Sequence, residues 1–409
     1  MRDREFSTYM LLNTPGFGAK SISYIYGNLK NLGLKVNDLF EKSLSQLTEY
    51  FPEIGRGKFS RANLSSLHSL DEQQLYASYQ QLKQENVHII GLDDERYPKS
   101  LIERLGGNAP PVLFCKGNLS LLNADSISII GSRDVSDYAI TLTKRIANRI
   151  AGCGYNVTSG FAKGVDTSAH IGALESNSTT TMVLSYGFNH LSIKKDIKEY
   201  NWEQNTLFIS QFMPYEKFSG QNAMARNKLV CALSKAVIVI ASGPERDASG
   251  KMSGTFDAGL TALKHNIPLF VLNPALLNPA PIGNIDLIKM GGIPLSNGDE
   301  LVQHLNSLHT STQIISTNYI LETELSSQTM YDPQTEYQTK SNKEIKETIL
   351  NLFNGKPLSI NEIIEQVHLD WTPQQLCNYL NNLDEVEIVK IGLSNYYKRK
   401  DFQIQPKLF

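Results

Sequence analysis

The sequence has 409 residues, more than one core of ordinary size holds, so two to four domains are expected. Its content of 41% hydrophobic and 20% charged residues is near the globular average, which excludes wholesale disorder and a fibrous repeat. Because 39 Lys and Arg residues face 41 Asp and Glu residues, a polyanionic partner would have to be bound by a local basic patch.

Residues 1–85 are predicted to form a helical domain of the sterile-α-motif (SAM) or helix-hairpin-helix kind. Apolar residues such as Ile22, Ile25 and Leu29 recur at helical spacing between short Gly and Pro breaks. The segment Thr14–Gly18 lies between two helical patterns. Its backbone amides could approach a phosphate, as in helix-hairpin-helix DNA modules, but a plain interhelical turn explains the same pattern. Both interpretations stay open.

Residues 86–305 are predicted to form an α/β domain, because short β-branched runs alternate there with helical stretches. Six strands are expected, at Ser126–Ile130, Asn156–Ser159, Thr180–Leu184, Leu207–Ile209, Ala236–Ile240 and Leu269–Leu272. Crossover helices are expected at Tyr138–Ala151, Thr167–Glu175, Lys195–Gln204, Arg226–Leu233 and Thr255–Lys264. This order predicts a Rossmann-like, doubly wound parallel sheet.

The C-terminal part is predicted to contain a linker, 306–341, and a winged helix, 342–400. The linker is rich in Ser, Thr, Gln and Asn and has no sustained period. The expected elements of the winged helix are helices at Glu344–Phe353 and Ile360–Gln366, a helix from Thr372-Pro373, and a hairpin of Ile388–Lys390 with Asn395–Tyr397. Because its candidate recognition helix, Pro373–Leu383, contains no Lys or Arg, protein contact or packing is favoured over DNA contact.

Two Gly-rich loops follow the first two strands of the predicted sheet. In the first loop, Gly131 and Ser132 allow close backbone approach to a phosphate, and Arg133 can bind it through two parallel hydrogen bonds. A tight turn with a solvated arginine is the alternative. The second loop supplies Ser159, Gly160, Lys163 and Gly164. Because both loops leave one sheet edge, they predict an anion pocket.

Two residues near the second loop invite a chemical role but have simpler explanations. Asp166 could act as a base, but its place just before a predicted helix favours an N-cap. His170 has no second ligand at metal spacing, so packing or hydrogen bonding is expected.

Two further segments extend the predicted pocket. The run Ala225–Lys228 precedes a predicted helix and contributes Arg226, Asn227 and Lys228. The loop Ser249–Thr255 follows the strand Ala236–Ile240 and opens another helix, whose exposed amides suit a phosphate. All four segments are read as loops that follow strands. A mononucleotide and a polynucleotide backbone would both satisfy such a site.

Taken in order, these motifs resemble those of the DNA-processing protein A family, DprA, also called Smf. The resemblance covers about residues 86–300. The matching segments are Tyr97-Pro98, Pro110–Phe114, Lys116–Leu119, Gly131–Arg133, Ser159–His170 (Ser-Gly-x-Ala-x-Gly-x-Asp-x-x-Ala-His) and Ala225–Lys228.

The resemblance implies a homodimeric single-stranded DNA-binding protein that delivers a RecA-type recombinase to DNA in natural transformation and recombination. A single-strand-binding protein is a further candidate partner, and neither catalysis nor a cofactor is implied. By analogy the strand would lie against four cations, with Ser132 and the glycines supplying backbone contacts; the cations are Arg133, Lys163, Arg226 and Lys228. Apolar residues near Asn284–Met290 could form the dimer surface.

Several departures from the family pattern indicate a divergent subgroup, which leaves competence, other recombination and phage defence open. They are Ser210–Pro214, Ala223–Ala225 and an apparent insertion at Ser242–Lys251. An enzyme is a competing class, since a related nucleotide-cleaving family carries Pro-Gly-Gly-x-Gly-Thr-x-x-Glu. The loop Met252–Ala258 lacks the Pro-Gly-Gly opening and the glutamate. A nucleotide sensor that signals through the winged helix is the third candidate.

The lack of a recognisable targeting segment and the spacing of the cysteines predict a cytoplasmic protein. The first ten residues contain no apolar core of a signal peptide, and no apolar run approaches the roughly 20 residues that span a bilayer. The four cysteines are far apart, with no C-x-x-C pair, so disulfides and a zinc site are not expected; they are Cys115, Cys153, Cys231 and Cys377.

Overall fold

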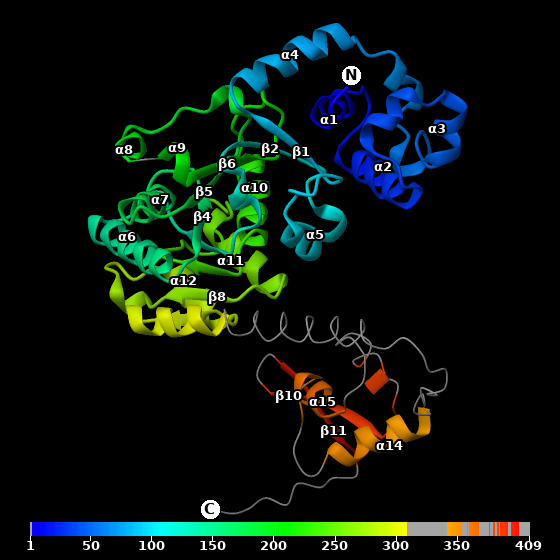
Figure 1. Ribbon diagram of the computed structural model, residues 1–409. Coiled ribbons are helices and arrows are strands. Elements are labelled where there is room, and N and C mark those ends of the chain that lie inside the picture. Colours follow the sequence, from blue (N-terminus) through cyan, green and yellow to red (C-terminus); the bar gives the residue numbers. More distant parts are fainter. Residues whose placement is uncertain are drawn as a thin grey trace, which may run out of the picture. The chain divides into compact units, whose positions relative to one another are not determined.

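The computed structural model divides the chain into two compact units, Met1–Ile320 and Leu321–Phe409 (Figure 1). The residues that it describes are 2–200, 202–308, 342–353, 358, 360–367, 376, 379–380, 383, 385–391 and 394–400. Each unit is considered by itself.

The first unit begins with a helical region. Its helices are α1 (Arg4–Leu12), α2 (Ala19–Leu32), α3 (Leu44–Tyr50) and α4 (Glu72–Gln84). Asp3 caps α1 by accepting a 2.7 Å hydrogen bond from the amide of Phe6, and Ser43 caps α3. The 3-10 helices of the unit are η1 (Val36–Glu41), η2 (Gly57–Phe59), η3 (Leu64–His68), η4 (Gly106–Asn108), η5 (Leu119–Asn123), η6 (Phe188–His190) and η7 (Pro274–Leu276).

The segment Thr14–Gly18 forms the turn between α1 and α2. Gly16 has φ of +81°, and a Cβ atom there would lie 2.0 Å from the carbonyl oxygen of Arg61. The turn therefore needs glycine both for its backbone angle and for its close contact with the chain at Arg61. The amide of Gly18 donates to the Ser21 hydroxyl. These contacts favour the plain interhelical turn over a phosphate-binding hairpin.

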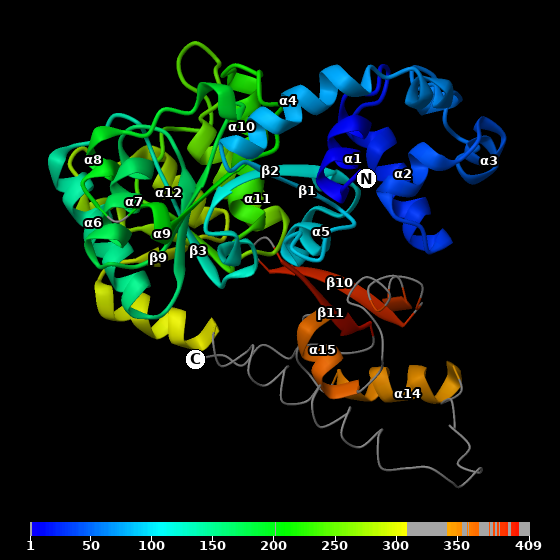
Figure 2. The ribbon, with the colours of Figure 1, turned by 45° about the horizontal axis from the view of Figure 1, so that its top comes forward.

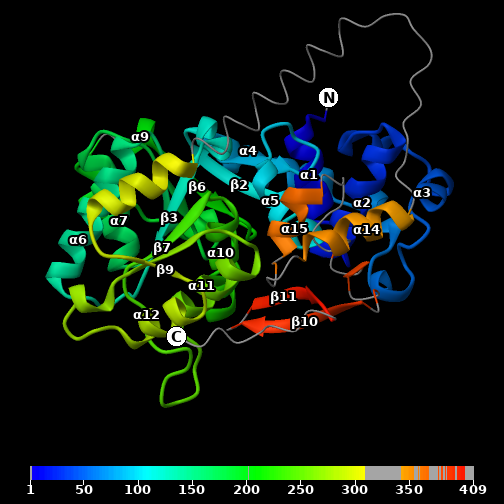
Figure 3. The ribbon, with the colours of Figure 1, turned by 90° about the horizontal axis from the view of Figure 1, so that it is seen from below.

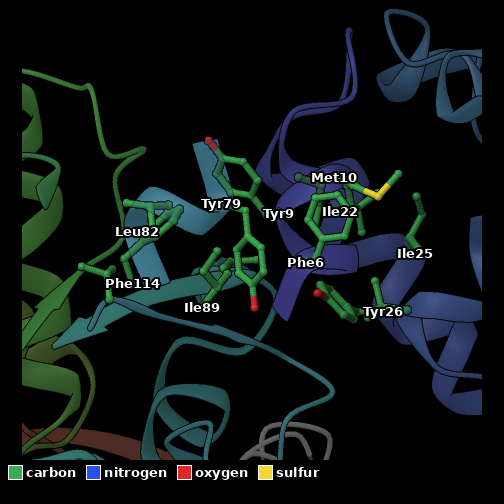
Figure 4. Packing of buried hydrophobic residues seen from close by; sticks show 14 of the residues in the cluster. Phe6, Tyr9, Met10, Ile22, Ile25, Tyr26, Tyr79, Leu82, Ile89 and Phe114 are labelled. Atoms are coloured by element: carbon green, nitrogen blue, oxygen red, sulfur yellow. The ribbon is translucent and has the colours of Figure 1, made fainter. Parts of the chain in front are cut away.

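One hydrophobic core joins the helical region to the sheet. Tyr79 and Leu82 of α4 pack in one cluster with side chains of α1 and of the first two strands, as Figure 4 shows. Phe6 of α1 packs against Tyr79 with ring centroids 5.3 Å apart, and Phe114 belongs to the same cluster. Because these side chains are almost completely buried, the helical region and the sheet pack as one body.

The sheet has nine strands in the order β1-β2-β6-β5-β4-β3-β7-β8-β9. Its strands are β1 (His88–Gly91), β2 (Val112–Gly117), β3 (Ser126–Ile130), β4 (Asn156–Gly160), β5 (Thr180–Val183), β6 (Thr206–Ser210), β7 (Ala236–Val239), β8 (Leu269–Leu272) and β9 (Ile293–Leu295). The run from β6 to β9 is parallel, whereas β1 and β2 join antiparallel at one edge. The six predicted strands are present and the mostly parallel α/β sheet is confirmed, but β1, β2 and β9 were missed.

Helices cover both faces of the sheet. One face carries α6 (Asp137–Gly152), α7 (Val165–Glu175) and a helix over 298–308; the other carries α5 (Lys99–Leu105), α10 (Gly220–Ala232), α11 (Gly254–Lys264) and α12 (Ile282–Lys289). Figure 2 shows α6 and α7 on the opposite side of the strands from α10 and α11. Successive connections therefore leave β3 and β7, which are neighbours, toward opposite faces, as a doubly wound fold requires.

Three sequence predictions need correction here. The helix predicted at Lys195–Gln204 is two short helices, α8 (Lys195–Lys198) and α9 (Trp202–Asn205). The helix predicted from Arg226 begins at Gly220, because the Ser219 hydroxyl accepts from the amide of Asn222 and caps it. Arg226 is thus an interior helical residue and not part of a loop. Residues 306–308 continue a helix, and most of the predicted linker lies outside the described residues.

The second unit contains helices α14 (Asn342–Leu352) and α15 (Ile360–Val367) and strands β10 (Val386–Ile391) and β11 (Ser394–Arg399). The strands pair antiparallel, with Ile388 opposite Tyr397, and Figure 3 shows them side by side. The two helices and the hairpin that the sequence predicted are therefore present. Most of the candidate recognition helix, Pro373–Leu383, falls outside the described residues.

Across the described ranges, no helix is long and apolar enough to cross a membrane. The same residues contain no group of three or more His, Cys, Asp or Glu side chains that could hold a metal ion.

Candidate functional site: a pocket at the switch point of the sheet

A pocket of about 980 Å³ opens at the carboxyl ends of β3 and β7. It is bounded by the loop after β3, the loop after β7, the end of β4, and the first turns of α10 and α11. Since β3 and β7 are parallel neighbours whose connections leave to opposite faces, this is where an open α/β sheet leaves a crevice for ligands.

The loop after β3 brings backbone and a guanidinium group to the pocket. Gly131, Ser132 and Arg133 all line it. The amide and hydroxyl of Ser132 both donate to the carbonyl of Ala241, over 2.9 and 3.0 Å, so Ser132 fastens the end of β3 to the loop after β7. Gly131 is needed because a Cβ atom there would lie 2.6 Å from the Val165 side chain. Arg133 is exposed, and its guanidinium lies 5.5 Å from the ring centroid of Phe218.

The loop after β4 is placed differently from what the sequence suggested. Ser159 is buried, and its hydroxyl donates to the Ile129 carbonyl over 2.6 Å, so it links two strands. Gly160 lines the pocket, whereas Lys163 lines a neighbouring groove. The ammonium group of Lys163 lies 2.5 Å from the carboxylate of Asp134, and both side chains are largely exposed.

Gly164 is the residue that makes this loop possible. Its φ is +76°, and a Cβ atom there would lie 2.4 Å from the carbonyl oxygen of Arg133. It holds the two loops in contact, together with the 3.3 Å hydrogen bond from the amide of Val165 to the Ser132 carbonyl. Gly164 is also the N-cap residue of α7. The prediction that Asp166 caps this helix was wrong, because the helix starts at Val165.

Asp166 instead pairs with Arg226 at the bottom of the pocket. The Arg226 side chain is 6% exposed, and its Nη1 lies 3.5 Å from the Asp166 carboxylate and 3.1 Å from the carbonyl of Val183. Burial lowers the pKa of Arg226, the carboxylate of Asp166 opposes that shift, and the charge of Arg133 adds to it. An arginine remains charged under these conditions. Both guanidinium groups therefore carry charge at one pocket.

Further features of Arg226 indicate that its position is set by the fold. A Cβ atom on Gly160 would lie 1.3 Å from Arg226 Nη1, so only glycine leaves room for the guanidinium. Its Nε is buried and has no hydrogen-bond partner in the described ranges. A buried donor without a partner is costly, and such donors at a pocket are candidates for ligand contact.

His170 holds the end of β4 in place, as the sequence predicted from its lack of a metal-ligand partner. The ring is buried, and its Nε2 hydrogen bonds to the carbonyl of Gly160 while its Nδ1 hydrogen bonds to the Thr180 hydroxyl. A carbonyl can only accept, so Nε2 carries the proton. Burial lowers the pKa of His170 to about 3, which keeps the ring neutral at physiological pH.

The other two residues of the Ala225–Lys228 run point to different surroundings. The side-chain amide of Asn227 donates to the Gly254 carbonyl over 2.9 Å and so joins α10 to the start of α11 at the edge of the pocket. Lys228 is exposed and does not line the pocket. Its charge opposes the effect of burial, which raises the pKa of Asp257 on α11. Two of the four predicted cations, Arg133 and Arg226, are thus brought together, while Lys163 and Lys228 lie elsewhere.

The loop after β7 forms an arm, residues 244–252, beside the pocket. The Asp247 carboxylate accepts from the amides of Ser249 and Lys251, which orders the turn, and Arg246 pairs with Met252 in a β-bridge. Asp247, Lys251 and Met252 line the pocket, followed by Ser253–Thr255 at the start of α11. Ser253 caps α11 by accepting from the Phe256 amide. The apparent insertion is therefore part of the pocket wall.

The net charge of the pocket depends on which charges are already paired. Asp166 is paired with Arg226 and Asp134 is paired with Lys163. Asp247 stays ionised, because hydrogen bonds from Ser249 and from the amide of Lys251 lower its pKa and the charge of Lys251 adds to that effect. Arg133 and Lys251 line the same pocket and form no ion pair in the described part of the chain. Two cations thus face the pocket beside the ionised Asp247 and the backbone amides at the start of α11, and the cations and amides together can hold an anion.

The pocket also contains Phe218, which no sequence motif indicated, and two methionines, of which Met252 belongs to the predicted loop Ser249–Thr255. Phe218, Met224 and Met252 line it, and Phe218 is 52% exposed. At the position where the related nucleotide-cleaving enzymes carry glutamate, Ala258 lines the pocket.

Comparison with known proteins agrees with the motif resemblance. A family model described as DNA recombination-mediator protein A matches residues 88–306. Protein Smf of Escherichia coli (strain K12) is 29% identical over 226 residues, which cover 55% of this chain and 58% of that protein. DNA processing protein DprA of Bacillus subtilis (strain 168) is 25% identical over 228 residues, which cover 54% and 73%. The matched part of the chain thus spans less than two thirds of the length of the Escherichia coli relative.

The crystal structure of DNA processing protein A from Streptococcus pneumoniae resembles this one with a TM-score of 0.59 at 22% identity, over 74% of this chain and 98% of that chain. That similarity concerns the fold alone. Because the family model covers more than half of the 409 residues and the motifs occur in order, the chain belongs to the DNA recombination-mediator protein A family.

Proposed function

We propose that this protein binds single-stranded DNA through the pocket at the carboxyl ends of β3 and β7 and acts as a recombination mediator. The observation that carries the proposal is the pair of cations Arg133 and Lys251, which lack ion-pair partners among the described residues and line a pocket bordered by the start of α11. The family membership supports the choice of DNA over another polyanion. Backbone phosphates would supply most of the binding free energy.

The wider assembly is part of the same proposal. The partner protein would be a RecA-type recombinase, with a single-strand-binding protein as a second partner, and the setting would be natural transformation or another recombination pathway in the cytoplasm. The chain would contain a helical domain (1–85), a Rossmann-like core (86–305), a linker (306–341) and a winged helix (342–400). The protein would act by binding, without catalysis or a cofactor.

A homodimer would form through α12 and the edge strand β9. Ile282, Ile285, Met290 and Ile293 expose between 38% and 59% of their surface there, whereas Asn284 is buried and bonds to Ile240 and Leu272. Exposed apolar side chains at a sheet edge favour association. Light scattering should give twice the mass of one chain, and Ile285→Glu should give the monomer. Ile102→Glu is the matched control, since Ile102 is 46% exposed on α5.

Binding can be tested by fluorescence anisotropy with a labelled single-stranded oligonucleotide of mixed sequence and its duplex at several salt concentrations. We expect the single strand to bind more tightly, with an affinity that falls as salt rises. Arg133→Ala and Lys251→Ala should each weaken binding, and the double variant should weaken it most. If the double variant binds like the unchanged protein, the pocket is not the DNA site.

A nucleotide sensor is the second candidate, favoured by the volume of about 980 Å³, which is ample for a whole nucleotide. Calorimetric titration with nucleoside monophosphates would test it. Saturable binding of a mononucleotide that Arg133→Ala abolishes, with no binding of the oligonucleotide, would favour the sensor over the DNA-binding protein.

A further inference from the structure

A second cavity, of about 190 Å³, lies on the face of the sheet that carries α6. Its apolar floor consists of six aliphatic side chains from α6, from the ends of β8 and β9, and from the segments that follow these strands; they are Leu142, Ile146, Leu272, Leu276, Leu295 and Leu301. Among the described residues this cavity, the α6 socket, shares no lining residue with the pocket at β3 and β7. A ligand of the socket would therefore bind apart from the DNA.

Two arginines of α6 form one rim of the α6 socket. Arg145 and Arg149 are about one helical turn apart, so they lie on the same side of the helix. Arg145 is exposed and forms no ion pair or side-chain hydrogen bond in the described ranges. Arg149 pairs with Asp299 over 3.2 Å, but their side chains are 50% and 94% exposed. Because such exposed pairs contribute little free energy, a carboxylate from another molecule can replace Asp299.

Arg149 lies at a place where the fold itself favours a negative charge. Its guanidinium lies against Gly298, where a Cβ atom would be 2.6 Å from Nε and 2.7 Å from Cζ. Gly298 begins the helix over 298–308, whose amino end carries partial positive charge. The Glu300 carboxylate of this turn is already held by a backbone amide and by the Asn297 side chain, each over 2.8 Å. A further anion at the rim would therefore bind to the guanidinium groups, where the start of the helix also attracts it.

We propose that the α6 socket binds an acidic peptide segment of a partner protein, with one aliphatic side chain in the socket and neighbouring carboxylates on Arg145 and Arg149. Burial of the aliphatic side chain supplies affinity, and each arginine can bind a carboxylate through two parallel hydrogen bonds. The same charges reject basic segments. A nucleic acid offers phosphates but no aliphatic side chain, so it fits the rim and not the floor. This inference goes beyond the proposed function, because it adds a protein-binding site apart from the DNA pocket.

The test measures the anisotropy of a fluorescein-labelled peptide, Ser-Asp-Asp-Leu-Asp-Asp-Ser, titrated with the full chain. One control peptide has Gly in place of Leu, and a second has Asn in place of every Asp. The protein variants are Arg145→Glu, Gly298→Ala and Arg56→Glu. Arg56→Glu is the matched control, because Arg56 is exposed in the helical region and lines neither the socket nor the pocket at β3 and β7.

We expect the acidic peptide to bind with a dissociation constant below about 0.5 mM, and the Gly peptide to bind at least about tenfold more weakly, since it lacks the side chain that the floor buries. The Asn peptide should also bind weakly, and salt should weaken binding of the acidic peptide by screening its charges. Arg145→Glu should lower the affinity for the acidic peptide about tenfold at low salt, because it places like charges together, whereas Arg56→Glu should lower it less than about twofold.

Gly298→Ala tests the place of Arg149 without a change of charge. The added methyl group would displace the guanidinium from the rim, and we expect the affinity for the acidic peptide to fall about threefold. Because alanine favours a helix more than glycine does, the free energy of unfolding should not fall, which urea unfolding would verify. Binding of single-stranded DNA should be normal in Arg145→Glu and Gly298→Ala, since neither residue lines the pocket at β3 and β7.

Several results would overturn the proposal. The acidic peptide could fail to bind at about 0.5 mM protein, or the Gly peptide could bind as tightly, which would mean that charge alone acts. An equal loss of affinity in Arg56→Glu and Arg145→Glu would show that the attraction is not specific to the socket. Displacement of the peptide by a single-stranded oligonucleotide would assign the arginines to nucleic acid. A change in the mass of the assembly in Arg145→Glu, measured by light scattering, would assign the socket to a second copy of this chain.

Discussion

The loops after β3 and β4 carry similar residues but lie in different surroundings. Each loop has a glycine where a buried strand ends and a cation shortly after it. In the first loop Arg133 follows Gly131 by two residues, and in the second Lys163 follows Gly160 by three. Arg133 lines the pocket without an ion-pair partner in the described ranges. Lys163 lines the neighbouring groove and pairs with Asp134, a residue at the border of the pocket. The comparison shows that the surroundings of a cation at a strand end depend on the neighbouring connection that faces it. Of these two strands, only β3 borders the switch point of the sheet.

The same contrast recurs within α10, where Arg226 and Lys228 are two residues apart. Two residues correspond to about 200° of helical rotation, so the two side chains point to opposite sides of the helix. Arg226 is buried against β4 and β5, and Lys228 is exposed. A basic run in a sequence therefore does not imply a basic surface.

The largest effect should come from Arg226→Ala. It would leave the buried carboxylate of Asp166 without its partner, and we expect the free energy of unfolding to fall by about 3 kcal/mol. Urea unfolding followed by circular dichroism would measure this. Lys228→Ala, two residues away and exposed, should change stability by less than about 0.5 kcal/mol.

The double variant Asp166→Asn, Arg226→Met tests whether Arg226 stabilises the fold through its charge or through its packing. Since it removes both charges, it should be more stable than Arg226→Ala alone. Equal losses in the single and double variants would show that Arg226 acts through packing against Gly160 and not through its charge.

The second effect concerns Arg133. Arg133→Ala should lower affinity for single-stranded DNA by about tenfold and reduce the slope of log K against log salt by about 0.7, since one phosphate contact is lost. Arg133→Lys should recover only part of the affinity, because an ammonium group cannot make the two parallel hydrogen bonds or stack on Phe218 in the same way. Anisotropy titrations at several salt concentrations would measure both quantities. Full recovery in Arg133→Lys would indicate that only charge matters.

The third effect is the pH dependence that His170 introduces. Burial lowers the pKa of the folded protein's His170 to about 3, while the unfolded chain keeps a value near 6.5. Below pH 6.5 the unfolded state therefore binds a proton that the folded state does not, so stability falls as pH falls toward 3. For one proton the slope is at most about 1.4 kcal/mol per pH unit.

The comparison of the unchanged protein with His170→Gln isolates this slope. Urea unfolding between pH 6.5 and 5 avoids the lower range in which carboxylates such as Asp94, whose pKa is lowered by Arg96 in spite of burial, are protonated. The difference in stability between the two proteins should shrink steadily as pH falls through this window. A constant difference would mean that the ring binds its proton equally well in the folded and unfolded protein, so that folding does not shift the pKa of His170.

The sequence predicted those parts of the fold that leave a local pattern. The strands Ser126–Ile130 and Leu269–Leu272 were predicted with their observed bounds, because runs of apolar residues mark buried parallel strands. The strand β9 was missed because it is short and lies at the sheet edge, where the apolar pattern is weak, and two of its three residues are exposed. The strands β1 and β2 are mostly buried, and their apolar runs were overlooked. Their place depends on pairing with strands distant in sequence.

In the site, too, the residues that leave a local sequence pattern were predicted and the others were not. The glycines at 131, 160 and 164 were found because motifs record close backbone contacts, and each of the three has a neighbour that excludes a Cβ atom. Phe218 was not found, since a single aromatic residue in a loop has no periodic or motif signal. The pairing of Asp166 with Arg226 joins residues 60 positions apart and follows only from the packing of α10 against β4.

The smallest effect should come from Lys163, and it decides whether the contrast between the two loops holds. Lys163 is 69% exposed and paired with Asp134, which is 86% exposed. Such surface pairs contribute little, and DNA would have to compete with Asp134 for the ammonium group. We therefore expect Lys163→Ala to lower affinity for single-stranded DNA less than threefold, and Asp134→Ala to raise it slightly by freeing the cation. A cycle of the two single variants and the double variant, titrated by anisotropy at low and high salt, would measure this coupling. If Lys163→Ala instead weakens binding as much as Arg133→Ala and flattens the salt dependence equally, the strand must pass from the pocket over Lys163 into the neighbouring groove, and the two loops are equivalent after all.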